Sequence, residues 1–184
     1  MTKLFDHDEI AQRISEIAAQ ITEDYRGKVT EENPALILCT LRGAVFFAAD
    51  LVRQIKIPCE LDFLKIHSYS GTRPSGVPVF DLGEQINVTG RHILIVEDIV
   101  DTGHTMAAIL ERFWGQNAAS IKVCTLLDKP SRREVEGIIP DYTGFAIEDL
   151  FVIGWGLDYN EKYRMLRDIM VYHPTEAEKE TLRR

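Results

Sequence analysis

The sequence contains no long hydrophobic run, since no apolar segment approaches the roughly 20 residues that a membrane-spanning helix needs. The amino-terminal stretch MTKLFDHDEI carries acids and lacks the basic-then-apolar order of a signal peptide. Cysteine is scarce too: Cys39, Cys59 and Cys124 are far apart in apolar surroundings, which favours reduced core thiols over a metal or redox site. We therefore expect a soluble, cytoplasmic protein.

A basic excess is also missing. The 21 lysines and arginines are outnumbered by 29 aspartates and glutamates, for a net charge of −8. Nucleic acids and anionic membranes are bound through clustered cations, so we expect neither as a partner. The acidic excess is compatible with a divalent cation that lies between carboxylates and a phosphate ligand.

Apolar periodicity predicts alternating helices and strands, and hence an α/β fold with a mainly parallel sheet. The expected helices are 10–25, 44–54 and 105–114, and the expected strands are 35–40, 61–67, 92–96, 121–127 and 151–153. Residues 68–81 predict a long loop without an element of its own, and 175–184 a loose terminal helix. With no internal repeat, the 184 residues predict one domain: a core of about 30–150, and a small cap from about 1–30 and 151–184.

The most informative segment is ILIVEDIVDTGHT, residues 93–105, where a buried strand runs into acids and then a small-residue turn that opens a helix. Ligands of open α/β sheets bind at such strand ends, and a helix amino terminus favours a phosphate. Thr102, Gly103 and Thr105 suit a phosphate monoester, while Glu97 and Asp98 suit adjacent sugar hydroxyls. With Asp101 between the two groups, the segment predicts a ribose-5-phosphate site.

A plainer interpretation is that the acids are solvated strand ends and the glycine terminates a turn. That interpretation requires only a few polar residues at a turn. It does not explain why an apolar run, Glu-Asp, Asp-Thr-Gly and a helix follow one another in this order. The segment also lacks the Gly-Lys-Thr of a P-loop, which argues against a nucleoside triphosphatase.

Residues 96–105 (VEDIVDTGHT) resemble the signature of the phosphoribosyltransferases, and further blocks resemble the branch that acts on 6-oxopurines. These blocks are Leu41-Arg42-Gly43, Ser68-Tyr69, LDKP at 127–130 and FVIGWGLDYNE at 151–161, in the family's order over about residues 35–165. The resemblance implies a type I phosphoribosyltransferase fold, with a central mainly parallel sheet flanked by helices and a base-binding hood from the two termini. It also implies Mg²⁺, hypoxanthine, guanine and phosphoribosyl pyrophosphate as ligands, IMP or GMP and pyrophosphate as products, and a homodimer or homotetramer.

The resemblance further implies a role for each block. Asp101 would accept a proton from the purine, and Ser68 and Tyr69 would begin a lid. The phosphoribosyl group would be bound by Glu97, Asp98, Asp101, Thr102, Gly103, His104 and Thr105, and pyrophosphate by Leu41, Arg42, Gly43 and Arg164, with a cis peptide at Leu41-Arg42. The purine would be bound by Lys129, Phe151, Val152 and Asp158, and the metal by Glu97, Asp98 and Asp158. Because the ammonium group of Lys129 donates to a carbonyl oxygen, oxopurines should be preferred over adenine.

Each of these residues also has an ordinary interpretation: a helix-start cation for Arg42, surface charges for Lys129 and Arg164, turn aspartates for Asp101 and Asp158, core packing for Phe151, and a surface loop for Ser68 and Tyr69. Rival functions are a xanthine-preferring enzyme and a phosphoribosyl-pyrophosphate-sensing regulator that binds nucleic acid. The regulator would need a basic face or an added DNA-binding segment, which the acidic composition does not support.

Three positions depart from commoner versions of the pattern: Arg42 and His104 where lysine is frequent, and Trp155 where tyrosine is frequent. None removes a required chemical group. A neutral His104 would reduce the positive charge near phosphate, so we expect pH-dependent affinity for phosphoribosyl pyrophosphate. A flat affinity profile between mildly acidic and mildly basic pH would contradict this expectation.

Overall fold

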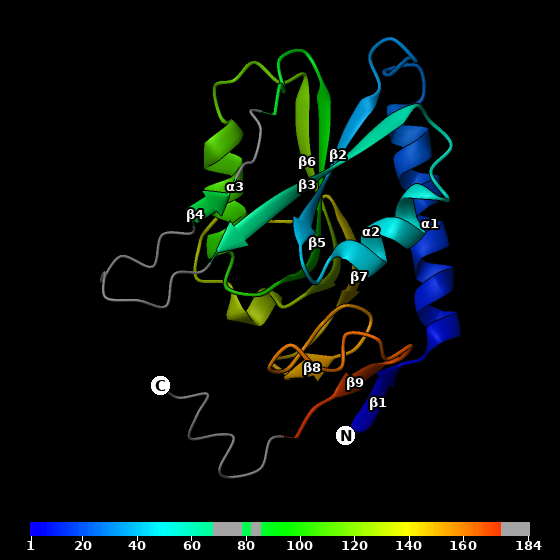
Figure 1. Ribbon diagram of the computed structural model, residues 1–184, viewed down its shortest axis with the longest axis vertical. Helices are drawn as coiled ribbons and strands as arrows, with labels where there is room; N and C mark the ends of the chain where they lie inside the picture. The colour runs from blue at the N-terminus through cyan, green and yellow to red at the C-terminus, as the bar shows by residue number, and fades with distance from the viewer. Residues whose placement is uncertain (68–78, 82–85, 174–184) are drawn as a thin grey trace.

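The computed structural model describes residues 1–67, 79–81 and 86–173, and its main feature is a six-stranded sheet in the order β4-β3-β2-β5-β6-β7 (Figure 1). Five strands are parallel: β2 (Ala35–Leu41), β3 (Cys59–His67), β5 (His92–Val100), β6 (Ser120–Asp128) and β7 (Tyr142–Ala146). The edge strand β4 (Val79–Asp81) is antiparallel to β3. The mainly parallel α/β sheet that the sequence predicts is therefore confirmed.

Helices cover both faces of this sheet. α1 (His7–Tyr25) and α2 (Val45–Val52) pack on one face, and α3 (His104–Phe113) packs on the other (Figure 1). The central strand β5 is buried on both sides: Leu94 and Val96 belong to the α1/α2 core, whereas Ile93 and Ile95 belong to the α3 core. A continuous β-branched and aliphatic run is what a doubly covered parallel strand requires.

The first helix begins at His7, directly after a capping box. The Asp6 side chain accepts from the amides of Asp8 and Glu9, and the Glu9 side chain accepts from the Asp6 amide. One face of the helix is apolar and buried against the sheet, through Ile10, Ile14, Ile17, Ala18, Ile21 and Tyr25. This spacing confirms the amphipathic helix expected from the sequence.

A second, three-stranded sheet joins the two ends of the chain. Its order is β1 (Thr2–Phe5), β9 (Ile169–Val171) and β8 (Val152–Ile153), all antiparallel. It lies at the end of the molecule where β2 and β6 terminate (Figure 1). The Phe5 and Phe145 rings stack between the two sheets, with their centroids 4.0 Å apart. The main chains of Gly43 and Gly156 lie close together at the same junction. The small sheet thus forms a hood over the strand ends where ligands of such folds bind.

The sequence did not predict β1, β7 or β9. It was also wrong for the end of the 68–81 loop, because Val79–Asp81 forms β4. A three-residue strand at an open edge depends on backbone pairing with its neighbour, which local composition does not reveal. The remaining expectations for that loop, Ser68 and Tyr69 included, and for the terminal helix at 175–184 lie outside the described residues.

The three cysteines are free thiols, with Cys39 and Cys124 buried and Cys59 half-buried. Burial, together with the nearby charges of Glu97 and Asp98, raises the pKa of Cys39 to about 12. Such a thiol is unreactive at neutral pH. Over the described ranges, no helix has both the length and the apolar character needed to cross a membrane.

Candidate active site

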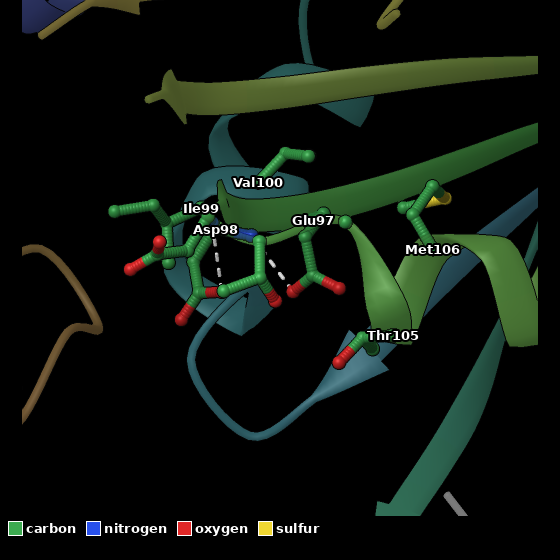
Figure 2. A pocket seen from close by; sticks show the side chains of 9 residues that line it. Glu97, Asp98, Ile99, Val100, Thr105 and Met106 are labelled. Atoms are coloured by element: carbon green, nitrogen blue, oxygen red, sulfur yellow. Dashed lines mark hydrogen bonds between the residues drawn. The ribbon is translucent and has the colours of Figure 1, made fainter. Parts of the chain in front are cut away.

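A cavity of about 280 Å³ lies where β5 ends and α3 begins (Figure 2). Its lining runs along one continuous segment and comprises Glu97, Asp98, Ile99, Val100, Asp101, Thr102, Gly103, Thr105 and Met106. Gly103 precedes the helix with a φ of 91°, a left-handed conformation that glycine adopts without strain. The cavity therefore adjoins the first turn of α3, whose leading amides lack partners within the helix and can donate to a phosphate.

The two acids that follow the buried part of β5 have different environments. Glu97 is only 8% exposed, and its Oε1 accepts a hydrogen bond from the Thr40 hydroxyl at 2.7 Å. Burial, followed by the negative charge of Asp98, raises the pKa of Glu97. Figure 2 shows the two carboxylates beside each other, with Thr105 on the first turn of α3 facing the same space. Two adjacent acceptors of this kind suit a diol.

Asp101 also lines the cavity, and its carboxylate lies between two cations. Its Oδ2 lies 3.3 Å from Lys129 Nζ, and its Oδ1 lies 3.2 Å from Arg132 Nε. Both cations also face Asp149, each at 3.7 Å. Lys129 is only 6% exposed, so its ammonium group is fixed beside Asp101 rather than solvated. The ordinary interpretation of Lys129 as a surface charge is therefore wrong.

Sequence reasoning did not identify Arg132, Arg133 or Asp149. The Arg133 guanidinium forms a largely buried ion pair with Asp128 and donates to the main-chain oxygen of Asp101 at 2.5 Å. The amide of Glu134 donates to the Thr102 oxygen at 2.9 Å. The segment after β6 thus holds the main chain of the loop between β5 and α3 in place. The only sequence signal was the adjacent pair of arginines that follows Lys129-Pro130 at the end of a predicted strand.

His104 lies outside the cavity lining and its side chain points to a different partner. Its Nε2 lies 3.0 Å from Glu134 Oε2, and both side chains are exposed. The third departure, Trp155, is buried and stacks on His7, with ring centroids 5.4 Å apart. Trp155 therefore helps to join the start of α1 to the hood.

A second group of charges lies where the β2–α2 loop meets the hood. The Leu41-Arg42 peptide is cis, as expected from the resemblance. Arg42 NH1 lies 3.0 Å from Glu161 Oε2, and Arg164 NH2 lies 3.1 Å from the same oxygen. Arg164 also pairs with Asp158 Oδ1 at 2.8 Å and donates to the Gly156 oxygen at 2.7 Å. The fold thereby brings together two arginines that are 122 positions apart in the sequence.

The hood adds an aromatic cluster. Phe151, the residue before β8, is 38% exposed, and its ring centroid lies 5.7 Å from that of Tyr159 and 6.0 Å from that of Tyr172. The next residue, Val152, is buried in β8. Because Asp149 faces Lys129, the chain leading into Phe151 lies beside the end of β6. A partly exposed ring at this position is available to a planar ligand, which the core-packing interpretation of Phe151 does not explain.

Within the described part of the chain, no three His, Cys, Asp or Glu side chains gather as a metal-binding group. Glu97, Asp98 and Asp158 therefore do not form a protein-only metal centre. Asp158 is engaged by Arg164 and by the Glu161 amide, and one Glu97 oxygen is engaged by Thr40. The oxygen donors suit Mg²⁺ only if a ligand supplies most of its coordination.

The sequence and the structure are similar to those of known phosphoribosyltransferases. The family model for the phosphoribosyl transferase domain matches residues 1–162. A hypoxanthine-guanine phosphoribosyltransferase of Streptococcus pneumoniae is 46% identical over 164 residues, 89% of this chain and 88% of that protein. A hypoxanthine-guanine-xanthine phosphoribosyltransferase of Tritrichomonas foetus is 42% identical over 163 residues, 89% and 86% of the two chains. A solved structure of Trypanosoma cruzi hypoxanthine phosphoribosyltransferase with the product IMP is 39% identical, with a TM-score of 0.88 over 95% of each chain.

Proposed function

The chain belongs to the phosphoribosyltransferase family, and from that premise we propose how its residues divide the work of the reaction. The reaction is a purine-salvage transfer: hypoxanthine or guanine and phosphoribosyl pyrophosphate give IMP or GMP and pyrophosphate. A purine nitrogen forms a bond to the anomeric carbon while the carbon–oxygen bond to pyrophosphate breaks. The protein must therefore hold two anionic groups, a planar base and a sugar that becomes cationic.

The 5-phosphate is assigned to the loop at 101–105. The α3 amides, the Thr102 and Thr105 side chains and the space around Gly103 offer donors at the positive end of the helix. Glu97 and Asp98 would accept hydrogen bonds from the ribose hydroxyls, because they line the same cavity from the last part of β5. His104 would contribute through its main chain, since its side chain faces Glu134.

The base is assigned to the space between Asp101, Lys129 and Phe151. Lys129 would donate to the 6-oxo group, and Phe151 would stack on the ring beside the Val152 main chain. Asp101, whose carboxylate is held by Lys129 and Arg132, would accept the imidazole proton as the ring nitrogen attacks. A 6-amino group would present a second donor to Lys129, so adenine should be rejected.

The leaving pyrophosphate is assigned to the Leu41–Gly43 loop and Arg164, where two guanidinium groups converge. Mg²⁺ would arrive with phosphoribosyl pyrophosphate, held by its oxygens and, partly through water, by Asp158, with Glu97 and Asp98 at the ribose hydroxyls. When bound, the ion neutralises the charge of the leaving group. Ser68 and Tyr69 are proposed, from the resemblance alone, as the start of a lid that excludes water.

One observation carries the proposal: Asp101 lines the cavity, and its carboxylate is held by the buried ammonium group of Lys129. The test is Mg²⁺-dependent nucleotide formation from phosphoribosyl pyrophosphate with hypoxanthine, guanine, xanthine and adenine. We expect Asp101→Asn to lower kcat/KM by about 10²–10⁴-fold, the usual contribution of a general base. Lys129→Ala should lower it by about tenfold to a hundredfold, the range for a charged hydrogen bond.

Two other outcomes would change the assignment. Turnover of xanthine in preference to hypoxanthine would indicate a xanthine-preferring enzyme. The name of the Tritrichomonas foetus relative includes xanthine as a substrate. Tight binding of phosphoribosyl pyrophosphate without turnover of any base, together with a gel shift of nucleic acid, would indicate a regulator instead.

A homodimer or homotetramer is proposed as the assembled form. Leu61 and Phe63 share the face of β3 opposite Leu64, and they are exposed, as is Phe46 on α2. Exposed aromatic and aliphatic side chains of this kind are typical of subunit interfaces. Light scattering should give a mass above that of one chain, and Phe63→Asp should lower it.

A further inference from the structure

The carboxylate of Glu161 lies between the two arginines of the proposed pyrophosphate site. Its Oε2 is 3.0 Å from Arg42 NH1 and 3.1 Å from Arg164 NH2. A single oxygen that bridges two guanidinium groups is the arrangement that a phosphate oxygen would also adopt. Glu161 therefore presents an anion to the groups that are assigned to bind one.

The backbone around Glu161 determines this position. Asn160, Glu161 and Tyr163 all have positive φ angles, of 52°, 60° and 75°. Non-glycine residues rarely adopt this region, and they persist there only when the surrounding structure requires it. Here the Glu161 amide donates to Asp158 Oδ2 at 2.8 Å, and Tyr159 and Lys162 exchange two main-chain hydrogen bonds of 3.1 Å. The turn thus directs residue 161 toward the arginines.

Arg164 does not depend on Glu161 for its position. Its guanidinium also pairs with Asp158 at 2.8 Å and donates to the Gly156 oxygen at 2.7 Å. The Glu161 side chain, in contrast, is 64% exposed and that of Arg42 is 67% exposed. Exposed ion pairs of this kind are weak, so an incoming polyanion can replace the Glu161 carboxylate. The hydrogen bond from Arg164, and then the charge of Arg42, lower the pKa of Glu161.

We propose that Glu161 is an internal competitor for the pyrophosphate subsite. When the subsite lacks pyrophosphate, the Glu161 carboxylate pairs with Arg42 and Arg164 and offsets part of their positive charge. Pyrophosphate displaces this carboxylate, and the return of the carboxylate favours release of the product. This role rests on the proposed assignment of both arginines to pyrophosphate. It makes Glu161 a positioning residue that tunes affinity for one ligand group and leaves the phosphate loop and the base pocket unaffected.

The test is the affinity of Glu161→Gln for magnesium pyrophosphate, measured by calorimetry and by product inhibition. We expect binding to tighten by about threefold to tenfold, the combined value of two ion pairs made by one exposed carboxylate. Affinity for IMP, which carries no pyrophosphate, should stay unchanged. Glu161→Asn serves as a second variant, because asparagine tolerates positive φ better than most residues. Unchanged or weaker pyrophosphate binding in both variants would overturn the proposal.

A matched control is Glu60→Gln. Glu60 is 59% exposed and pairs with Arg91 at 2.6 Å, near the opposite ends of the strands. Its removal changes net charge equally, so any general electrostatic effect on anion binding should show there too. Equal tightening in Glu60→Gln would count against a specific role for Glu161.

A further variant separates this proposal from the assignment on which it rests. If Arg42→Gln leaves pyrophosphate affinity unchanged, the pyrophosphate subsite itself is misassigned, and the role of Glu161 fails with it. If Arg42→Gln weakens pyrophosphate binding while Glu161→Gln does not tighten it, only the competition is refuted. In the double variant the gain from Glu161→Gln should shrink, because one of its two partners is gone.

Discussion

The main chain of Gly43 and the carboxylate of Asp98 are packed so closely that a Cβ built on residue 43 would overlap Asp98 Oδ2. The same glycine presents its carbonyl oxygen to Gly156, where a Cβ would also overlap. Gly43 therefore joins three parts of the site: the loop that is proposed to bind pyrophosphate, the acids that are proposed to bind the ribose, and the hood. Each contact leads to a separate prediction.

Gly43→Ala should impair function more than stability. Its φ is not in the left-handed region, so the added methyl group causes no backbone strain there and mainly displaces the flexible Asp98 carboxylate. Displacing a substrate-positioning group by about 1 Å lowers kcat/KM by up to about a hundredfold. Steady-state kinetics with varied phosphoribosyl pyrophosphate should show this loss, while the denaturant midpoint stays near that of the wild type. A large drop in the midpoint would indicate that Asp98 cannot move.

Gly156→Ala should impair both function and stability. Gly156 has a φ of 100°, and its Cβ would overlap the Gly43 main-chain oxygen, which cannot rotate away. Backbone strain alone costs about 1–3 kcal/mol, and the overlap adds to it. The control is Gly90→Ala, whose φ is 71° but whose Cβ would meet nothing within 4 Å. Chemical unfolding should rank Gly156→Ala well below Gly90→Ala, and equal losses would show that the Gly43 contact is unimportant.

Arg133→Met should destabilise the protein, although Arg133 is not among the residues that are proposed to contact the substrates. Its removal leaves Asp128, only 8% exposed, without its guanidinium partner, and it frees the main-chain oxygen of Asp101. Breaking a buried pair from one side costs about 3 kcal/mol. Arg53→Met is the control, since its exposed pair with Asp50 should be worth under about 1 kcal/mol. Similar unfolding free energies for the two variants would contradict the structural role of Arg133.

The stability of the fold should fall on mild acidification because of His92. Burial, and then the charge of Lys28, lower the pKa of His92 below its ordinary value of 6.5, so the unfolded chain binds the proton more readily. The stabilising contribution is present above pH 6.5 and is lost as the pH falls through that value toward the folded-state pKa. Unfolding free energies at about pH 7.5 and about pH 5.5 should therefore differ less in His92→Asn than in the wild type. An identical pH dependence in both proteins would remove His92 as the cause.

Much of the site was predictable because its chemistry is local in sequence. Residues 97–105 form one strand end, one turn and one helix start, and the cavity is lined by that same segment. Arg42 and Arg164 were expected from resemblance, and the fold brings them to a common partner. Arg132 and Asp149 were missed because a charge after a strand resembles any surface charge until its neighbours are known.

By itself, the sequence determined the alternation of helices and strands, the buried centre of the sheet and the turn between β5 and α3, since each depends on apolar spacing or on a few consecutive residues. Only the tertiary structure decided the pairing of β1 with β9, the burial of Lys129 beside Asp101 and the position of Glu161 between two arginines. These relationships join residues from distant parts of the chain. Their energies come from packing, desolvation and charge proximity in space, which local sequence patterns do not encode.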